Sequence, residues 1–136
     1  MRRANCIEHH VEDFDGEVRF FREILGCKEN FYMPGGPASF QIADNFCVLV
    51  LARDPAHPPY ASLKGETIDI SVELSELDGI YEELRAKGAV IRQEPVTQPA
   101  GIRNFYFETP GGLTIEYEAP TTETAAQILD KIFGRR

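Results

Sequence analysis

The sequence predicts an α+β protein built from two copies of one strand–helix–strand–strand unit. Three observations support this. Short runs alternate apolar and polar residues, as strands do, and two segments have the apolar spacing of amphipathic helices. The same order of elements starts again about sixty residues after its first start. We therefore expect a single domain over 1–136, with a first module at about 4–54, a second at about 65–119 and a C-terminal helix at about 121–134.

The first unit has two further strands after its helix. Its predicted elements are a strand at 5–12, a helix at about 16–25, and strands at 39–43 and 46–52. Asp15 is available as the N-cap of the helix and Gly26 as its stop. The last two strands are separated by Asp44 and Asn45, which are favourable in tight turns.

The second unit follows a polar connector at 53–65, in which His57 is expected to be exposed. Its predicted elements are strands at 67–72, 89–93, 105–107 and 113–117, and a helix at about 76–87. Ser75 and Asp78 resemble a capping box, and Gly88 ends the helix. The apolar spacing over 121–133 predicts a further helix that docks on the body or on a second subunit.

The most informative segment is the predicted hairpin at 104–117. Pro110, Gly111 and Gly112 supply the backbone freedom that a tight reversal needs. Alternation sends Leu113, Ile115 and Tyr117 to one face of the second strand, and Thr114, Glu116 and Glu118 to the other. One face can pack in a core while the other presents a carboxylate to a ligand.

Composition excludes several classes of function. The formal net charge of −8 repels phosphate backbones and anionic lipids, so we expect no nucleic-acid or membrane partner. No apolar run is long enough for a membrane helix or a secretion signal, which predicts a cytoplasmic location. Cys6, Cys27 and Cys47 are odd in number and far apart in sequence, as expected for reduced, mostly buried thiols.

The segments 11–26, 81–88 and 105–116, in this order and spacing, resemble the vicinal oxygen chelate superfamily, which includes glyoxalase I, extradiol dioxygenases and bleomycin-resistance proteins. The resemblance covers nearly the whole chain. It implies two βαβββ modules that form one cupped, mostly antiparallel sheet around a cavity, and it implies a homodimer. Metal-dependent members take one ligand from the first strand and one from the last strand of each module.

This sequence departs from that ligand pattern. The resemblance puts the two first-strand positions on Cys6 and Thr67, where the family has His or Gln, and the strand at 47–51 contains no carboxylate. Only Glu116 matches. We therefore expect that the usual metal site is absent and that no cofactor is required.

A displaced site remains an alternative. Alternation places Cys6, Glu8 and His10 on one face of the first strand, and Thr67, Asp69 and Ser71 on the matching face of the second unit's first strand. His10, Glu8, Asp69 and Glu116 could then form a nitrogen and oxygen site for zinc, iron or manganese. His9 should point the other way, toward the helices, as a buried structural histidine.

Two functions follow from these residues. The first is a binding protein that holds a small organic molecule, cationic or aromatic, in an acidic cavity. Its expected ligand-binding residues are Glu8, His10, Asp69, Ser71, Glu116 and Phe105. Arg103 is a candidate to neutralise the clustered carboxylates. The second is a lyase, isomerase or dioxygenase that uses the displaced metal site, or His10 as the catalytic acid or base.

Overall fold

The computed structural model describes residues 2–54, 56 and 62–134, and it divides into two compact units. Unit 1 contains the chain up to Glu66 together with the turn Thr109–Leu113. Unit 2 contains Thr67–Glu108 and the chain from Thr114 onward. The expectation for His57 lies outside the described residues.

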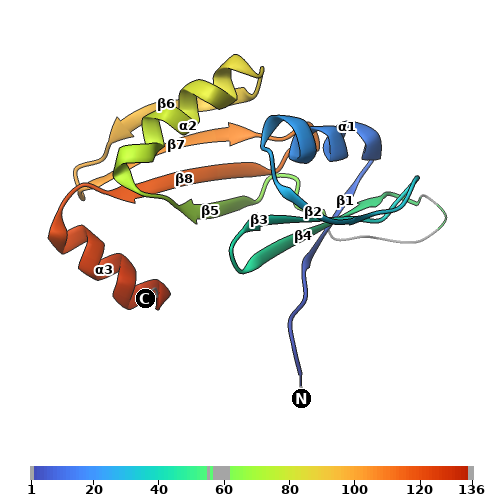
Figure 1. Cartoon of the computed structure of the whole chain (residues 1–136), viewed down its shortest axis with the longest axis horizontal. Coiled ribbons are helices and arrows are strands. Elements are labelled where there is room, and N and C mark those ends of the chain that lie inside the picture. The colour runs from blue at the N-terminus through green and yellow to red at the C-terminus, as the bar shows by residue number, and fades with distance from the viewer. Residues whose placement is uncertain (1, 55, 57–61, 135–136) are drawn as a thin grey trace. The chain divides into compact units, whose positions relative to one another are not determined.

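Each unit contains one βαβββ module with its own four-stranded sheet (Figure 1). The elements of unit 1 are β1 (Ile7–Val11), α1 (Phe14–Arg19) with a π-helical continuation η1 (Phe20–Ile24), β2 (Lys28–Tyr32), β3 (Ala38–Ala43) and β4 (Phe46–Ala52). Those of unit 2 are β5 (Thr67–Ser71), α2 (Leu74–Ala86), β6 (Val90–Thr97), β7 (Ile102–Glu108), β8 (Thr114–Pro120) and α3 (Glu123–Phe133).

The strand orders β1-β4-β3-β2 and β5-β8-β7-β6 are the same arrangement used twice. In each sheet the first strand pairs in parallel with the last, and the other pairings are antiparallel. The α+β class, the two βαβββ modules and the C-terminal helix are therefore confirmed. The strands hydrogen-bond as two sheets, however, where we expected one.

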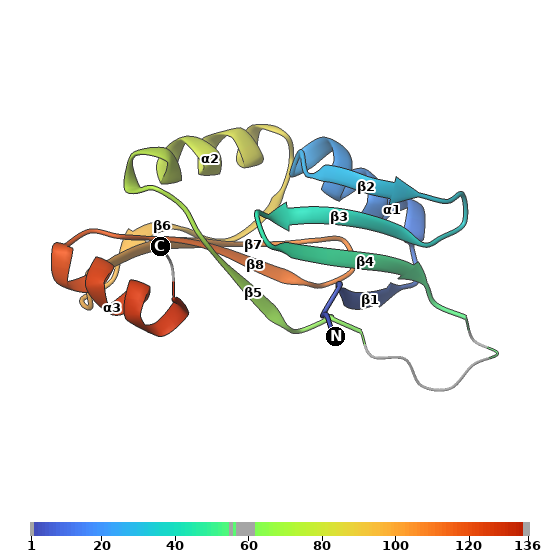
Figure 2. The same ribbon diagram turned by 60° about the horizontal axis from the view of Figure 1, so that its bottom comes forward.

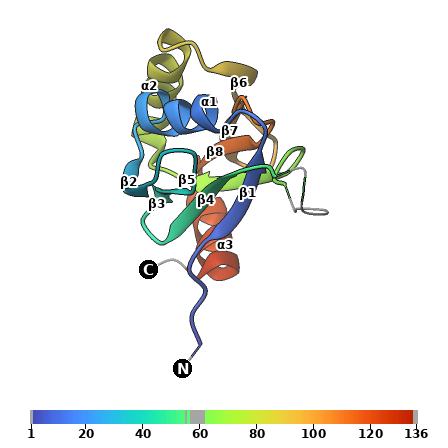
Figure 3. The same cartoon turned by 90° about the vertical axis from the view of Figure 1, so that its right-hand side faces the viewer.

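In unit 1, α1 lies over one face of the sheet (Figure 3). Phe21 stacks on Phe40 with ring centroids 5.5 Å apart, and Val48 and Val50 of β4 are fully buried beneath the helix. The N-cap is Asp13 instead of the expected Asp15, because the Asp13 carboxylate accepts the Gly16 N–H at 3.0 Å. The helix therefore begins early enough to bury Phe14.

In unit 2, α2 covers one face of the sheet (Figure 2). The buried core between them includes Leu77, Tyr81 and Leu84 of α2, and Ile70, Phe105, Phe107, Ile115, Tyr117 and Ala119 of the sheet. The capping box expected at Ser75 and Asp78 is wrong. The N-cap is Glu73, without a side-chain cap, and Asp78 instead accepts two hydrogen bonds from the Arg103 guanidinium, at 2.9 and 3.0 Å.

The C-terminal helix α3 is capped at both ends. The Thr122 hydroxyl accepts the Ala125 N–H at 3.0 Å, and Gly134 ends the helix in the left-handed conformation with φ of +63°. Ala125 and Leu129 are buried. No helix in the described part of the chain has both the length and the apolar character of a membrane span.

Candidate functional site

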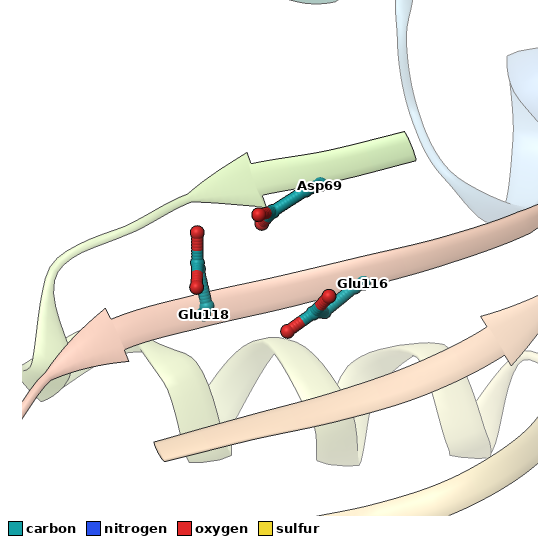
Figure 4. Close-up of side chains that lie close together, drawn as sticks. All are labelled: Asp69, Glu116 and Glu118. Carbon is teal, nitrogen blue, oxygen red and sulfur yellow. The ribbon is translucent and has the colours of Figure 1, made fainter. Parts of the chain in front are cut away.

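Three carboxylates gather on the face of the second sheet opposite α2 (Figure 4). Asp69 of β5 is the register partner of Glu116 on β8, and Glu118 lies two residues further along β8. Neighbouring strands in register present their side chains to the same face, so alternation alone brings the three together. One oxygen from each lies within 4.8 Å of the others. We call Asp69, Glu116 and Glu118 the acidic cluster.

The protonation of Glu116 is shifted by this arrangement. Partial burial and the nearby charge of Asp69 raise the pKa of the Glu116 carboxyl above its ordinary value, against the opposing effect of hydrogen bonds from Asn104 and Tyr106. The pKa of the Tyr106 phenol is also raised, by burial and by the charge of Glu116. Tyr106 therefore stays protonated and donates its hydrogen bond to Glu116.

A relay of amides fixes the direction in which Asn104 points. The Asn104 Oδ1 accepts hydrogen bonds from the side-chain amides of Gln93 at 3.0 Å and Gln98 at 3.2 Å. With its oxygen occupied by two donors, Asn104 presents Nδ2 to Glu116 Oε2 at 3.0 Å. The position of the Glu116 carboxylate is thus set by Tyr106 and by Asn104, whose orientation Gln93 and Gln98 fix.

The expected site residues are divided between the units. Asp69 and Glu116 come together in unit 2, and Ser71 lies beside them as the register partner of Glu118. Glu8 and His10 lie on β1 in unit 1, where Glu8 Oε1 and His10 Nε2 are 3.1 Å apart. Each pair forms as alternation predicted, and the complete set of Glu8, His10, Asp69 and Glu116 stays a prediction.

Phe105 and Arg103 do not lie with the acidic cluster. Phe105 is the register partner of Tyr117, on the face that α2 covers, and it has no exposed surface. Its place is in the core, because residues 105 and 116 have opposite parity across the hairpin. Arg103 is on the same helix-covered face and pairs with Asp78, so it does not neutralise Glu116.

Two of the hollows formed by described residues are lined by residues outside the acidic cluster. One, of about 350 Å³, lies in unit 2 beside α2 and β6 and is lined by Tyr81, Arg85, Ile91, Arg92, Gln93 and Glu94. The other, of about 390 Å³, lies in unit 1 and is lined by Asn5, Cys6, Glu8, Phe31, Ser39 and Leu49. Within the acidic cluster Asp69 is exposed, Glu116 is half-buried and Glu118 is buried, and the acidic cavity stays a prediction.

Unit 1 contains a buried polar network around Glu17, of which the sequence pattern predicted only the buried His9. His9 is fully buried, as expected, and its Nε2 donates to Glu17 Oε2 at 2.7 Å. Because the Leu63 N–H donates to His9 Nδ1 at 3.3 Å, Nε2 is the protonated nitrogen. Glu17 also accepts from the Thr109 hydroxyl and the Gly111 N–H, both at 2.6 Å. All its donors are internal, so this network is structural.

The acidic cluster fits some divalent ions better than others. Three carboxylates are hard oxygen donors, which suit calcium, magnesium or manganese. Zinc and iron(II) sites usually include an imidazole or a thiolate, and the cluster itself supplies neither. The sequence pattern places Glu118 on the face of Glu116 without assigning it to the site, and it does not single out Asn104, although Asn104 is the register partner of Glu118.

The model of the Glyoxalase/Bleomycin resistance protein/Dioxygenase superfamily matches residues 4–117, and the chain belongs to this superfamily. No curated protein matches the chain by sequence. Several solved structures resemble it. A glyoxalase/bleomycin resistance protein/dioxygenase from Nocardioides is 26% identical, with a TM-score of 0.64 over 90% of this chain and 87% of that one.

Two further structures share the fold at lower identity. A lactoylglutathione lyase from Agrobacterium tumefaciens is 17% identical, with a TM-score of 0.65 over 87% of this chain and 95% of that one. The fosfomycin resistance protein FosX from Listeria monocytogenes is 20% identical, with a TM-score of 0.66 over 92% of this chain and 98% of that one.

Proposed function

We propose that this protein binds a small organic cation, such as a compound bearing an amine, at the acidic cluster. The observation that carries the proposal is the convergence of Asp69, Glu116 and Glu118, with oxygens within 4.8 Å of one another. Three like charges at this separation repel, and a bound ammonium group would remove that repulsion while donating up to three hydrogen bonds to the carboxylates.

The surroundings of Glu116 support a cationic ligand. Its pKa is raised by burial and by Asp69, so the neutral carboxyl persists to a higher pH than in an ordinary glutamate. A bound cation stabilises the ionised form, and binding therefore releases protons at any pH where Glu116 is still protonated in the free protein. Affinity for an amine should rise with pH as Glu116 ionises, until the amine itself loses its proton.

Cys6 and Thr67 occupy the two first-strand positions where metal-dependent members of the family have a ligand, so these positions do not support metal-dependent chemistry. The proposed function accordingly places the ligand directly on the carboxylates, without a metal between them. Other superfamily members named among the solved structures include a lactoylglutathione lyase and a fosfomycin resistance protein. A small-molecule ligand is in keeping with those names.

The experiment is a calorimetric screen that compares organic amines with neutral compounds of the same shape. We expect binding of amines only, weakened at least about tenfold by Glu116→Gln, which corresponds to about 1.4 kcal/mol. Glu82→Gln, on the exposed side of α2, is the matched control and should bind as the wild type does. Equal binding of amines and their neutral counterparts, or no binding by any of them, would refute the proposal.

The second candidate is a metal-dependent lyase, isomerase or dioxygenase, and the same cluster favours it. In that case Asp69, Glu116 and Glu118 would hold a divalent ion that supplies Lewis-acid chemistry, and His10, paired with Glu8, would be a candidate acid or base. Titration with calcium, magnesium, manganese and zinc salts separates the two functions. Micromolar binding of one ion that Glu116→Gln abolishes, with no binding of amines, would replace the first function by the second.

We also propose that the protein is a cytoplasmic homodimer. The dimer is what the resemblance implies, and α3 leaves apolar side chains exposed: Ile128, Ile132 and Phe133 are each more than half accessible. Light scattering coupled to size-exclusion chromatography should give twice the monomer mass of 15.3 kDa. A monomer at micromolar concentration would contradict the dimer. Fractionation of the source cells tests the location.

A further inference from the structure

Two cysteines that are far apart in sequence are neighbours in unit 1. The first register pair of β1 and β4 is Ile7 with Val48, so the residues just before them, Cys6 and Cys47, continue the same row. Neighbouring strands lie about 4.8 Å apart. That spacing falls in the range of about 4.4–6.8 Å between Cα atoms that a disulfide requires.

A chain of hydrogen bonds through Asn30 and Ser39 connects the two sulfurs. The Asn30 side-chain amide donates to Cys47 Sγ at 3.4 Å and to Ser39 Oγ at 3.1 Å, and Ser39 Oγ lies 3.7 Å from Cys6 Sγ. Cys47 in turn donates to Gln41 Oε1 at 3.0 Å. The thiols are thereby held on one face of the sheet and not turned away from each other.

The two thiols also interact with each other. Burial raises the pKa of Cys47, and the charge of Cys6 and a hydrogen bond with Cys6 raise it further. Cys6 is exposed and lines the 390 Å³ hollow of unit 1, so a reagent in that hollow reaches it first. An accessible thiol with a second thiol beside it is the arrangement typical of a redox-active pair.

We propose that Cys6 and Cys47 form a reversible dithiol–disulfide pair that is oxidised by a small disulfide such as oxidised glutathione. The Cys6 thiolate attacks one sulfur of the oxidant, breaks its S–S bond and expels one glutathione thiolate. The Cys47 thiolate then attacks the Cys6 sulfur of the mixed disulfide and expels the second. Two electrons pass from the protein to the oxidant, and the two protons lost by the cysteines are taken up by the two glutathiones.

The third cysteine provides an internal control. Cys27 lies in the loop after η1, and burial raises the pKa of its thiol to about 12. At neutral pH almost none of it is thiolate, and the thiolate is the reactive form. The pKa of Cys47 is also raised, but Cys47 attacks a mixed disulfide that Cys6 holds beside it, whereas Cys27 must meet the oxidant from solution. Exposure to the oxidant should therefore leave Cys27 untouched while the pair reacts.

The test treats the native protein with oxidised glutathione and then measures free thiols and intact mass. We expect the thiol count to fall from three to one, the mass to fall by two hydrogen atoms, and peptide mapping to show Cys6 joined to Cys47. Dithiothreitol should restore all three thiols. Cys27→Ser should leave the loss of two hydrogens unchanged.

Single variants separate the steps. Cys47→Ser should stop at a stable glutathione adduct on Cys6, and Cys6→Ser should show no loss of thiols on the same timescale. Matching circular dichroism spectra for the variants and the wild type would show that each variant is folded. A lasting glutathione adduct on wild-type Cys6 with Cys47 still free, a disulfide between two chains through Cys6, or no reaction would overturn the proposal.

Discussion

Glu17 is a carboxylate with no exposed surface that is nevertheless fully provided with donors. It accepts hydrogen bonds from His9 of β1, eight residues away in sequence, and from Thr109 and the Gly111 N–H in a turn that lies 92 to 94 residues away. A buried charge is tolerated only when it is satisfied in this way. Glu17 therefore stabilises unit 1 by joining β1, α1 and the turn Thr109–Leu113.

Replacing Glu17 with alanine should lower the free energy of unfolding by at least about 3 kcal/mol, because His9, Thr109 and Gly111 lose their shared acceptor in a buried site. Urea denaturation followed by circular dichroism measures the change. Glu12→Ala is the matched control, since the Glu12 side chain is 84% exposed, and it should change stability by less than about 0.5 kcal/mol. A loss below about 1 kcal/mol for Glu17→Ala would contradict the structural role.

Glu116 should make stability depend on pH in the direction opposite to most glutamates. Its raised pKa means that the folded protein holds this proton more tightly than the unfolded chain does. Stability therefore falls as pH rises from the ordinary glutamate pKa through the raised one.

Glu116→Gln removes that titration. The variant should be more stable than the wild type at pH 7, by about 0.5 kcal/mol because the partly exposed carboxylate is screened by water. The difference should vanish below the ordinary glutamate pKa, where both side chains are neutral. Urea denaturation across this pH range measures it, and a Glu116→Gln protein that is less stable at pH 7 would contradict the assignment.

At the scale of the elements, the turn between β7 and β8 has no room for a side chain at its centre. A Cβ on Gly111 would lie 2.7 Å from Val11 Cγ1 and 2.8 Å from Glu17 Oε2. Gly79 is the opposite case, because it lies inside α2 and a Cβ there would meet nothing within 4 Å.

Alanine should therefore have opposite effects at the two glycines. Gly111→Ala should destabilise the protein by about 1–3 kcal/mol through the forced displacement of neighbouring groups. Gly79→Ala should stabilise it by about 0.5–1 kcal/mol, because alanine is the better helix former and limits the unfolded chain. Thermal unfolding of the two variants beside the wild type measures both changes, and the same sign for both would contradict this account.

Most elements could be predicted from the sequence because the residues that begin and end them act locally. Gly26, Gly88 and Gly134 each end a helix with positive φ, as a glycine after an apolar helical pattern indicates. The strand β2, in contrast, could not be predicted from local sequence signals. The sequence of Lys28–Tyr32 does not alternate apolar and polar side chains, because every residue of this strand is exposed and none is needed in the core. Only the resemblance implied a strand there.

The sequence predicted those parts of the candidate site that depend only on which face of a strand a residue occupies. Parity placed Asp69 beside Glu116 and Glu8 beside His10, because it needs only the correct strand register. It could not reveal that Arg103 pairs with Asp78 of α2, since that depends on how a helix packs over the sheet. The pairing of Cys6 with Cys47 was likewise hidden, because it depends on a parallel strand pairing across forty residues.

At the scale of the whole molecule, the chain leaves unit 1 and returns to it for one short turn. β7 and β8 belong to unit 2, but Thr109–Leu113, the turn that joins them, belongs to unit 1. The chain therefore passes between the units three times. Loss of either unit removes support from this hairpin, so we expect the two units to unfold together.

Two probes can test whether unfolding is one transition. The chain has no tryptophan, so its intrinsic fluorescence comes from tyrosine. In a variant with Tyr32→Phe and Tyr60→Phe, the remaining Tyr81, Tyr106 and Tyr117 report on unit 2. Labelling of the Cys27 thiol reports on unit 1, in a variant with Cys6→Ser and Cys47→Ser. The two urea midpoints should coincide. Midpoints that differ by more than about 0.5 M would show that the units unfold independently.

The turn Thr109–Leu113 also decides where this protein can be extended. Hairpin tips are ordinarily among the most permissive places for inserting a peptide tag or a second domain. Here Thr109 and Gly111 of the tip donate hydrogen bonds to the buried Glu17 carboxylate, and Gly112 has a φ of +85°. An insertion at this point would separate those anchors, so the tip should be among the least permissive sites in the chain.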